Sequence, residues 1–153
     1  MNQSEAHTWP AWVAGAKSVT RRFWKDITAK RYKKGVVFHC FDNAVFRHGK
    51  PIGTARVLED AYQESLSDMP DGDWAAEGFA WMHEHKGTLP PKAIEKKLLW
   101  TNGNCSFDAF GAWRNTGPTM WVLRFQVLTV EPAALERLNA LLIANNHPPL
   151  RAN

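Results

Sequence analysis

The chain has 153 residues, 44% of them hydrophobic, which is enough for one domain with a buried core. No stretch approaches 18 apolar residues, and residues 1–7 lack the charged-then-apolar order of a signal peptide, so we expect a cytoplasmic protein without a membrane partner. The two cysteines, Cys40 and Cys105, are too few for a disulfide framework.

The net charge of +4 is unevenly distributed along the chain. Residues 1–50 carry ten lysines and arginines against three acids, a net charge of +7, whereas residues 51–80 carry one arginine against seven acids, a net charge of −6. A basic first third is typical of proteins that bind polyanions. The alternative is that the basic and acidic segments pair with each other across the fold.

In chain order, residues 1–8 are expected to form a flexible tail and residues 10–16 a short helix that begins at Pro10. Residues 24–34 suggest an amphipathic helix, with Ile27 and Tyr32 facing inward and a basic outer face. Three strands follow over residues 36–41, 44–47 and 52–58, separated by turn residues. This pattern favours a small curved antiparallel sheet or barrel over a doubly wound sheet.

The second half of the chain is predicted to contain helices over residues 74–85 and 92–99, then a long loop over residues 100–118. Loops of that length often bind ligands or close over them. Residues 120–130 are predicted to be a strand. Residues 132–145 are predicted to be a helix with a leucine stripe, so that residues 131–153 pack on a domain formed by residues 9–130.

The segment from Lys17 to Trp24 concentrates the chemistry of the chain: one lysine, two hydroxyls and two arginines, followed by aromatic residues. If the segment is extended, Lys17 and Arg21 share one face and Thr20 lies on the other, because strand side chains alternate. If it is helical, all three share a face. The segment could bind an anion, supply a nucleophile or stack on a base, or it could be an ordinary solvated basic edge.

Four motifs in sequence order resemble the ASCH domain family of the PUA-like superfamily. They are Gly15-x-Lys17-x-x-Thr20-x-Arg22, the stretch Gly49–Val57, Ala76-Glu77-Gly78-Phe79, and the stretch Trp121–Phe125. The resemblance implies an α+β fold: a PUA-like curved antiparallel β-barrel with flanking helices. It also implies binding of RNA or a modified nucleobase in a basic cleft.

In the ASCH-type amidohydrolases that deacetylate N4-acetylcytidine, a lysine, a threonine and a glutamate form the proposed catalytic set. The resemblance carries these roles to Lys17 as base, Thr20 as nucleophile and Glu77 as the group that handles protons. Ribonuclease activity, also found in the family, and non-catalytic nucleic-acid binding remain alternatives. A third alternative is an interaction protein that uses its C-terminal helix.

Basic and aromatic residues from three parts of the chain are the candidate contacts to single-stranded nucleic acid. They are Arg21, Arg22, Trp24, Lys25, Arg56, Trp113 and Arg114. No metal site or cofactor is expected, because the chain has no CxxC, HExxH, GxGxxG or Walker motif. The oligomeric state is not predicted.

Overall fold

The computed structural model describes residues 8–85 and 105–151. The strands are β1 (Val19–Arg22), β2 (Val37–Phe41), β3 (Pro51–Val57), β4 (Tyr62–Ser65) and β5 (Thr119–Val130). The helices are α1 (Trp9–Val13), α2 (Asp26–Ala29), α3 (Asp73–Ala76), α4 (Phe79–Glu84), α6 (Phe107–Arg114) and α7 (Pro132–Ala144). Two 3₁₀ turns are η1 (Val45–Arg47) and η2 (Leu66–Asp68).

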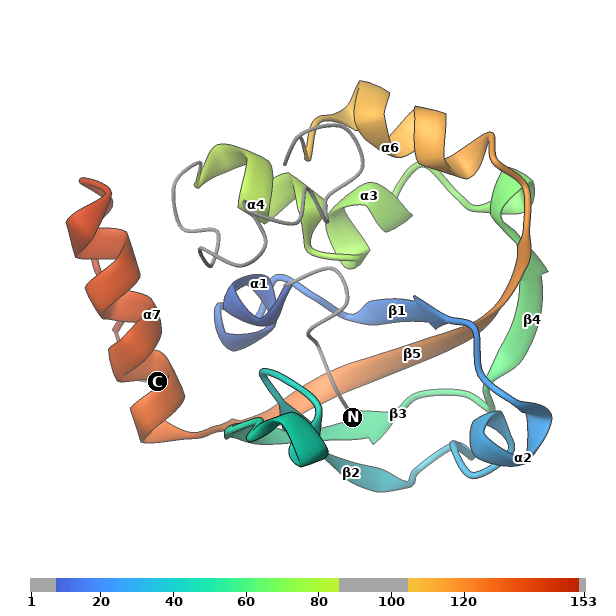
Figure 1. The fold of residues 1–153 in the computed structure, drawn as a ribbon, viewed down its shortest axis with the longest axis horizontal. Coiled ribbons are helices and arrows are strands. Elements are labelled where there is room, and N and C mark those ends of the chain that lie inside the picture. The colour runs from blue at the N-terminus through green and yellow to red at the C-terminus, as the bar shows by residue number, and fades with distance from the viewer. Residues whose placement is uncertain (1–7, 86–104, 152–153) are drawn as a thin grey trace.

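The sheet is organised around β5, which is 12 residues long and antiparallel to every strand that it contacts (Figure 1). Its first half pairs with β1 and β4, and its second half pairs with β3, which in turn pairs with β2. The result is the α+β architecture expected from the sequence. The sheet does not close into the β-barrel that the family resemblance implies. Within the described residues, the strand order β1-β5-β3-β2 leaves the sheet open.

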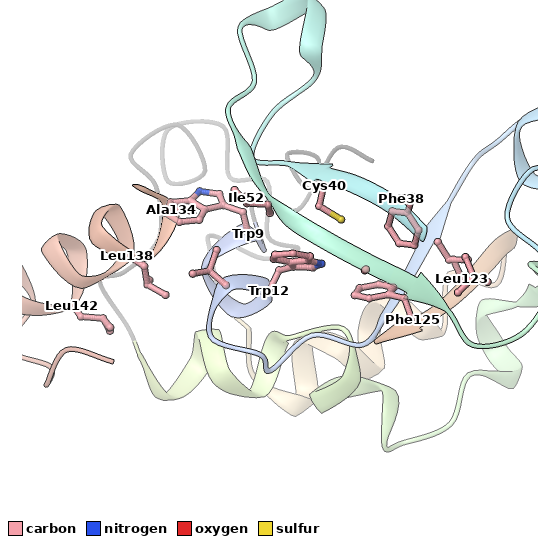
Figure 2. Packing of buried hydrophobic residues seen from close by; sticks show 13 residues of the cluster. Trp9, Trp12, Phe38, Cys40, Ile52, Leu123, Phe125, Ala134, Leu138 and Leu142 are labelled. Atoms are coloured by element: carbon pink, nitrogen blue, oxygen red, sulfur yellow. The ribbon is translucent and has the colours of Figure 1, made fainter. Parts of the chain in front are cut away.

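One hydrophobic cluster fills the space between α1, the sheet and α7 (Figure 2). Trp12 of α1 is fully buried and lies against Gly53 of β3, where a Cβ atom would be 2.9 Å from the indole. Alternation along the strands directs Phe38, Cys40 and Phe125 into this cluster. From α7 come Ala134, Leu138 and Leu142, so the predicted leucine stripe packs on the sheet.

A second cluster covers the other side of β5 and joins α1, η2, α4 and α6. Its largest members are Phe79, Met82 and Phe110, all at most 2% exposed. The two clusters lie on opposite sides of the β1–β5 pair, so residues that alternate along β1 face different environments. This division decides which side chains of the Lys17–Trp24 segment come together.

Several predicted elements differ from the structure. The helix expected over residues 24–34 is only one turn, α2, and Ile27 is 70% exposed, because the charged residues around it offer no apolar stripe to bury. Residues 45–47 form η1 rather than a strand. The expected loop over residues 100–118 contains α6, capped by Ser106, whose hydroxyl accepts from the Ala109 amide at 3.2 Å.

The strand predicted over residues 120–130 and the helix predicted over residues 132–145 are confirmed as β5 and α7. The helix predicted over residues 92–99 lies outside the described residues, as does all but the last residue of the predicted tail. No described helix is long and apolar enough to cross a membrane.

The helix predicted over residues 74–85 is divided at Gly78, which has a φ of +89° and stands between α3 and α4. A Cβ atom there would lie 2.7 Å from the Cβ of Ala11 and 3.3 Å from that of Lys17. The glycine therefore lets α1 and the residue before β1 approach the break in the helix. This approach places Glu77 beside Lys17.

We expect Gly78→Ala to lower the free energy of unfolding by about 2–3 kcal/mol, through left-handed backbone strain and overpacking. Chemical denaturation measures the change. Gly72→Ala is the matched control, because a Cβ atom at Gly72 meets nothing within 4 Å and its backbone is already right-handed. Equal changes in the two variants would contradict this account of the helix break.

Candidate functional site

Six charged side chains meet between the sheet and α3, and we call them the charge cluster. They are Lys17, Arg21, Glu64, Asp73, Glu77 and Arg124. Strand register explains why they meet: Arg21 is opposite Val122, Glu64 is opposite Met120, and Arg124 is opposite Val19, so all three point to the side covered by α3 and α4. The cluster balances three cations against three carboxylates.

Arg21 is the centre of the charge cluster and is only 3% exposed. Its guanidinium donates to Glu77 Oε1 at 3.1 Å, to Glu64 Oε2 at 3.2 Å and to Asp73 Oδ2 at 2.5 Å. Burial would lower the pKa of this guanidinium, but the three carboxylates raise it above its ordinary value. Arg21 therefore holds three acidic side chains inside the protein, a position that a phosphate in solvent does not reach.

Asp73 connects Arg21 to a second arginine. Both carboxylate oxygens accept from Arg124 at 3.0 Å, and Arg124 also donates to the Tyr62 hydroxyl at 3.1 Å. Burial of Asp73 opposes ionisation, but hydrogen bonds from Arg124 and Arg21 outweigh it and lower the pKa of the carboxyl. The cluster is thus a continuous network from β4 to the start of β1.

Lys17 and Glu77 form the most deeply buried ion pair of the cluster, with side chains 1% and 4% exposed. Lys17 Nζ donates to Glu77 Oε2 at 2.7 Å and to the Glu77 backbone carbonyl at 2.8 Å. Burial lowers the pKa of Lys17, Glu77 opposes that effect, and Arg22 and Arg21 add to it. A neutral amine has two N–H groups for these two acceptors, which leaves its lone pair for a proton.

Thr20 is brought to a different place from Lys17 and Glu77. It lies opposite Leu123, which belongs to the first hydrophobic cluster, whereas its neighbour Arg21 faces the charge cluster. The Thr20 side chain is fully buried, and its Oγ1 has no hydrogen-bond partner among residues 8–85 and 105–151. A buried hydroxyl without a partner is uncommon and calls for an explanation. Of the predicted catalytic set, Lys17 and Glu77 are in contact, and Thr20 is hydrogen-bonded to neither.

Lys17 also lies in the wall of an open groove of about 1350 Å³. The groove runs between the α1–β1 connection, the part of β5 that β1 does not cover, and α7. Polar side chains on its walls come from all three, namely Ser18, Gln126, Thr129, Glu136 and Asn139. At one end Asn139 exchanges two hydrogen bonds with the backbone of Leu150, which ties the C-terminal segment to α7.

Some predicted nucleic-acid contacts lie at the surface. Lys25 and Arg56 are exposed, the latter on β3. Arg22 is half-buried and donates to the Arg21 carbonyl at 2.9 Å. Trp24 stacks on Tyr32, with ring centroids 4.8 Å apart, so one of its faces is covered. Arg22, Trp24 and Lys25 come from the end of β1 and its connection to α2, whereas Arg56 lies on β3.

The two predicted contacts from α6 have structural partners. Arg114 donates to the Met69 carbonyl at 3.1 Å and pairs with Asp71. Trp113 packs edge-on against Phe79, with centroids 6.0 Å apart. Both side chains thereby hold α6 on the second hydrophobic cluster.

Sequence reasoning missed Glu64, Asp73 and Arg124 of the charge cluster and the residues of the groove. The only signal for Glu64 and Asp73 is the acidic stretch after residue 58, whose pairing with the basic segment is one of the two alternatives stated above. Within residues 8–85 and 105–151, no group of three or more His, Cys, Asp or Glu side chains could hold a metal ion.

No family model matches the chain, and no curated protein matches it at a significant level. Among solved structures, it is similar to protein EF3133 from Enterococcus faecalis V583, which is described with the family name DUF984. The two share 13% sequence identity and a TM-score of 0.47, over 84% of this chain and 76% of that one. A likeness of this degree carries no inference about function, so the functional argument depends on the site itself.

Proposed function

We propose that the protein hydrolyses the amide bond of an N4-acylated cytosine nucleoside in the groove beside Lys17. The observation that carries the proposal is a buried amine whose pKa is lowered and whose position is fixed by Glu77, at the wall of an open groove. Amines of lowered pKa in clefts are typical of catalytic bases. The volume of the groove exceeds that of most small-molecule sites, so a nucleoside fits.

The charge of the groove favours a neutral substrate. Its exposed charged side chains are Glu136 and Arg151, which have opposite signs. The sequence suggested a basic cleft, but the exposed lysines near α2, such as Lys25 and Lys30, do not line this groove. A nucleoside without phosphates therefore suits it better than a polynucleotide does.

We assign the roles as follows. Ser18 Oγ, which is exposed in the groove beside Lys17, attacks the acyl carbon while Lys17 takes the hydroxyl proton, and the cytosine amine leaves with a proton from Lys17. Water then hydrolyses the acyl ester on Ser18 to release the carboxylic acid. Glu77 orients the amine of Lys17 throughout. Thr20, the nucleophile that the family resemblance implies, does not line the groove and faces the first hydrophobic cluster, so it becomes the alternative nucleophile.

We further propose that the domain is of the ASCH type within the PUA-like superfamily, with an incompletely closed sheet. Support comes from how the motifs lie in space. The Lys17 motif and the Glu77 motif are 60 residues apart in sequence and are joined by the buried ion pair. The Trp121–Phe125 motif lies on β5 directly opposite β1.

Incubation with N4-acetylcytidine and with a labelled single-stranded RNA, followed by mass spectrometry of both, tests the function. We expect loss of the acetyl group and an intact RNA. The reaction should disappear in Ser18→Ala and persist in Thr20→Val, and the reverse result would assign the nucleophile to Thr20. An unchanged nucleoside would contradict the proposal.

The same experiment separates the alternatives. Cleavage of the RNA would indicate a ribonuclease. Intact substrates together with RNA retention that weakens steeply with salt would indicate a non-catalytic nucleic-acid-binding module. The basic segment near α2, with its stacked Trp24 and Tyr32, favours that second candidate.

A further inference from the structure

The turn between β2 and β3 presents two apolar side chains to solvent. Phe46 is 83% exposed and Val45 is 65% exposed, and they are adjacent on η1. Single exposed apolar residues are common on protein surfaces. Two adjacent apolar residues at the tip of a hairpin indicate a binding surface when the turn is rigid and the surrounding side chains are charged. Both conditions hold here.

The turn is held by a dense set of hydrogen bonds. Asp42 accepts from the Lys50 amide through its side chain at 2.7 Å and donates to the Lys50 carbonyl through its own amide at 3.0 Å. The Ala44 carbonyl accepts from the amides of Arg47 and Gly49. A Cβ atom at Gly49 would lie 2.1 Å from the Asn43 carbonyl oxygen, so the closure admits only glycine. Phe46 is therefore preorganised in solvent, which lowers the entropy cost of binding through it.

The hairpin surface around Phe46 is basic. Arg47 and Lys50 flank the tip, and the Arg47 guanidinium lies 5.4 Å from the Phe46 ring centroid. Along β2 and β3, Phe38 and Ala55 point into the core, so their neighbours His39 and Arg56 lie on the outer face, where they are exposed. No acidic side chain among the described residues pairs with any of the three cations Arg47, Lys50 and Arg56.

We propose that the outer face and the tip of the β2–β3 hairpin bind single-stranded nucleic acid. Phe46 and the guanidinium of Arg47 stack on bases, while Lys50 and Arg56 contact phosphates. The positive charge of the hairpin favours an anionic partner. The Arg47–Phe46 stack favours bases over lipid chains, because it offers flat π-faces rather than an apolar wedge.

This proposal rests on neither the groove nor the hydrolysis. No described residue of the β2–β3 hairpin lines the Lys17 groove, so binding by the hairpin can be measured without any turnover. A failed hydrolysis assay therefore leaves this proposal standing, and a failed binding assay leaves the hydrolysis standing.

Fluorescence anisotropy with a labelled 12-nucleotide single-stranded RNA tests the proposal across a salt series. Phe46→Ser should weaken binding roughly tenfold, the loss typical of one stacked base. Lys50→Gln and Arg56→Gln should each reduce the slope of log affinity against log salt by about 0.7, the value for one phosphate contact on a single strand.

A matched control comes from α7. Ile143 is 60% exposed and apolar, and it belongs neither to the hairpin nor to the basic segment near α2. Ile143→Ser should leave affinity and salt slope unchanged. An equal loss of binding in Ile143→Ser and Phe46→Ser would overturn the proposal, as would a wild-type protein that does not bind RNA. Binding to phosphatidylserine vesicles but not to RNA, lost in Phe46→Ser, would also overturn it.

Discussion

Glu77→Gln is expected to lower the free energy of unfolding by about 3–5 kcal/mol, the usual cost of breaking a buried ion pair from one side. Glu77 is 3% exposed and neutralises two buried cations, Lys17 at 2.7 Å and Arg21 at 3.1 Å. Glutamine fills the same volume, so packing is preserved while the charge is removed. Lys17 and Arg21 would then share a low-dielectric site with too little negative charge.

Chemical denaturation of wild type and variant measures this cost, and Asp60→Asn provides the matched control. Asp60 pairs with Lys33 at 2.8 Å, close to the distance in the buried pair, but both side chains are more than half exposed. Exposed pairs contribute about 0–1 kcal/mol, so the control should change little. If the two variants lose equal stability, the charge cluster does not hold α3 against β1.

The elements that sequence predicted best are those whose own residues decide their structure. β5 is a run of 12 residues rich in β-branched and aromatic side chains, and α7 has a leucine stripe at helical spacing, so each element is specified by its own residues. The segment from Lys17 to Trp24 adopts one of its two predicted conformations. It is extended at β1, so Thr20 and Arg21 face opposite sides.

Sequence could not predict where the charges of that segment would lie. The sequence predicts Arg21 as a nucleic-acid contact, because the arginine guanidinium suits bidentate pairing with anions. Its actual partners, Glu64, Asp73 and Glu77, come from 43 to 56 residues further along the chain. Whether a basic and an acidic segment pair or stay apart depends on tertiary contacts that no local pattern records.

The helix near residue 77 illustrates a second limit. The capping aspartate before Trp74 predicts one helix over residues 74–85, but Gly78 adopts a left-handed conformation and divides it. The reason lies outside the helix, in the close approach of Ala11 and Lys17 to Gly78. That division is also what turns Glu77 toward Lys17, so the missed feature and the candidate site have one cause.

Lys17→Met is expected to reduce kcat/KM for N4-acetylcytidine by about 10²–10⁴-fold, the usual contribution of a general base. Methionine replaces the buried chain with an apolar one of similar length, and Glu77 keeps its bond to Arg21. The fold should therefore survive, which circular dichroism can check. Lys33→Met is the control, because that lysine is exposed and pairs only with Asp60 among the described residues.

The pH dependence distinguishes a catalytic Lys17 from a merely structural one. Only the neutral amine is a base, and burial lowers its pKa below 10.5, so the wild-type rate should rise with pH and level off before that value. The same shift acts on stability. Between the lowered pKa and 10.5 the unfolded chain binds more protons than the folded one, so stability from this group rises with pH.

Lys17→Met should lose both pH effects together. One contrary result is a variant whose stability no longer rises with pH but whose rate depends on pH as in the wild type. In that case Lys17 titrates in the folded protein without acting as the base. The reaction would then belong to another group of the groove. If the rate profile disappears while the stability increment remains, the buried amine is not the group whose pKa is lowered, and the geometry around Glu77 would need a different explanation.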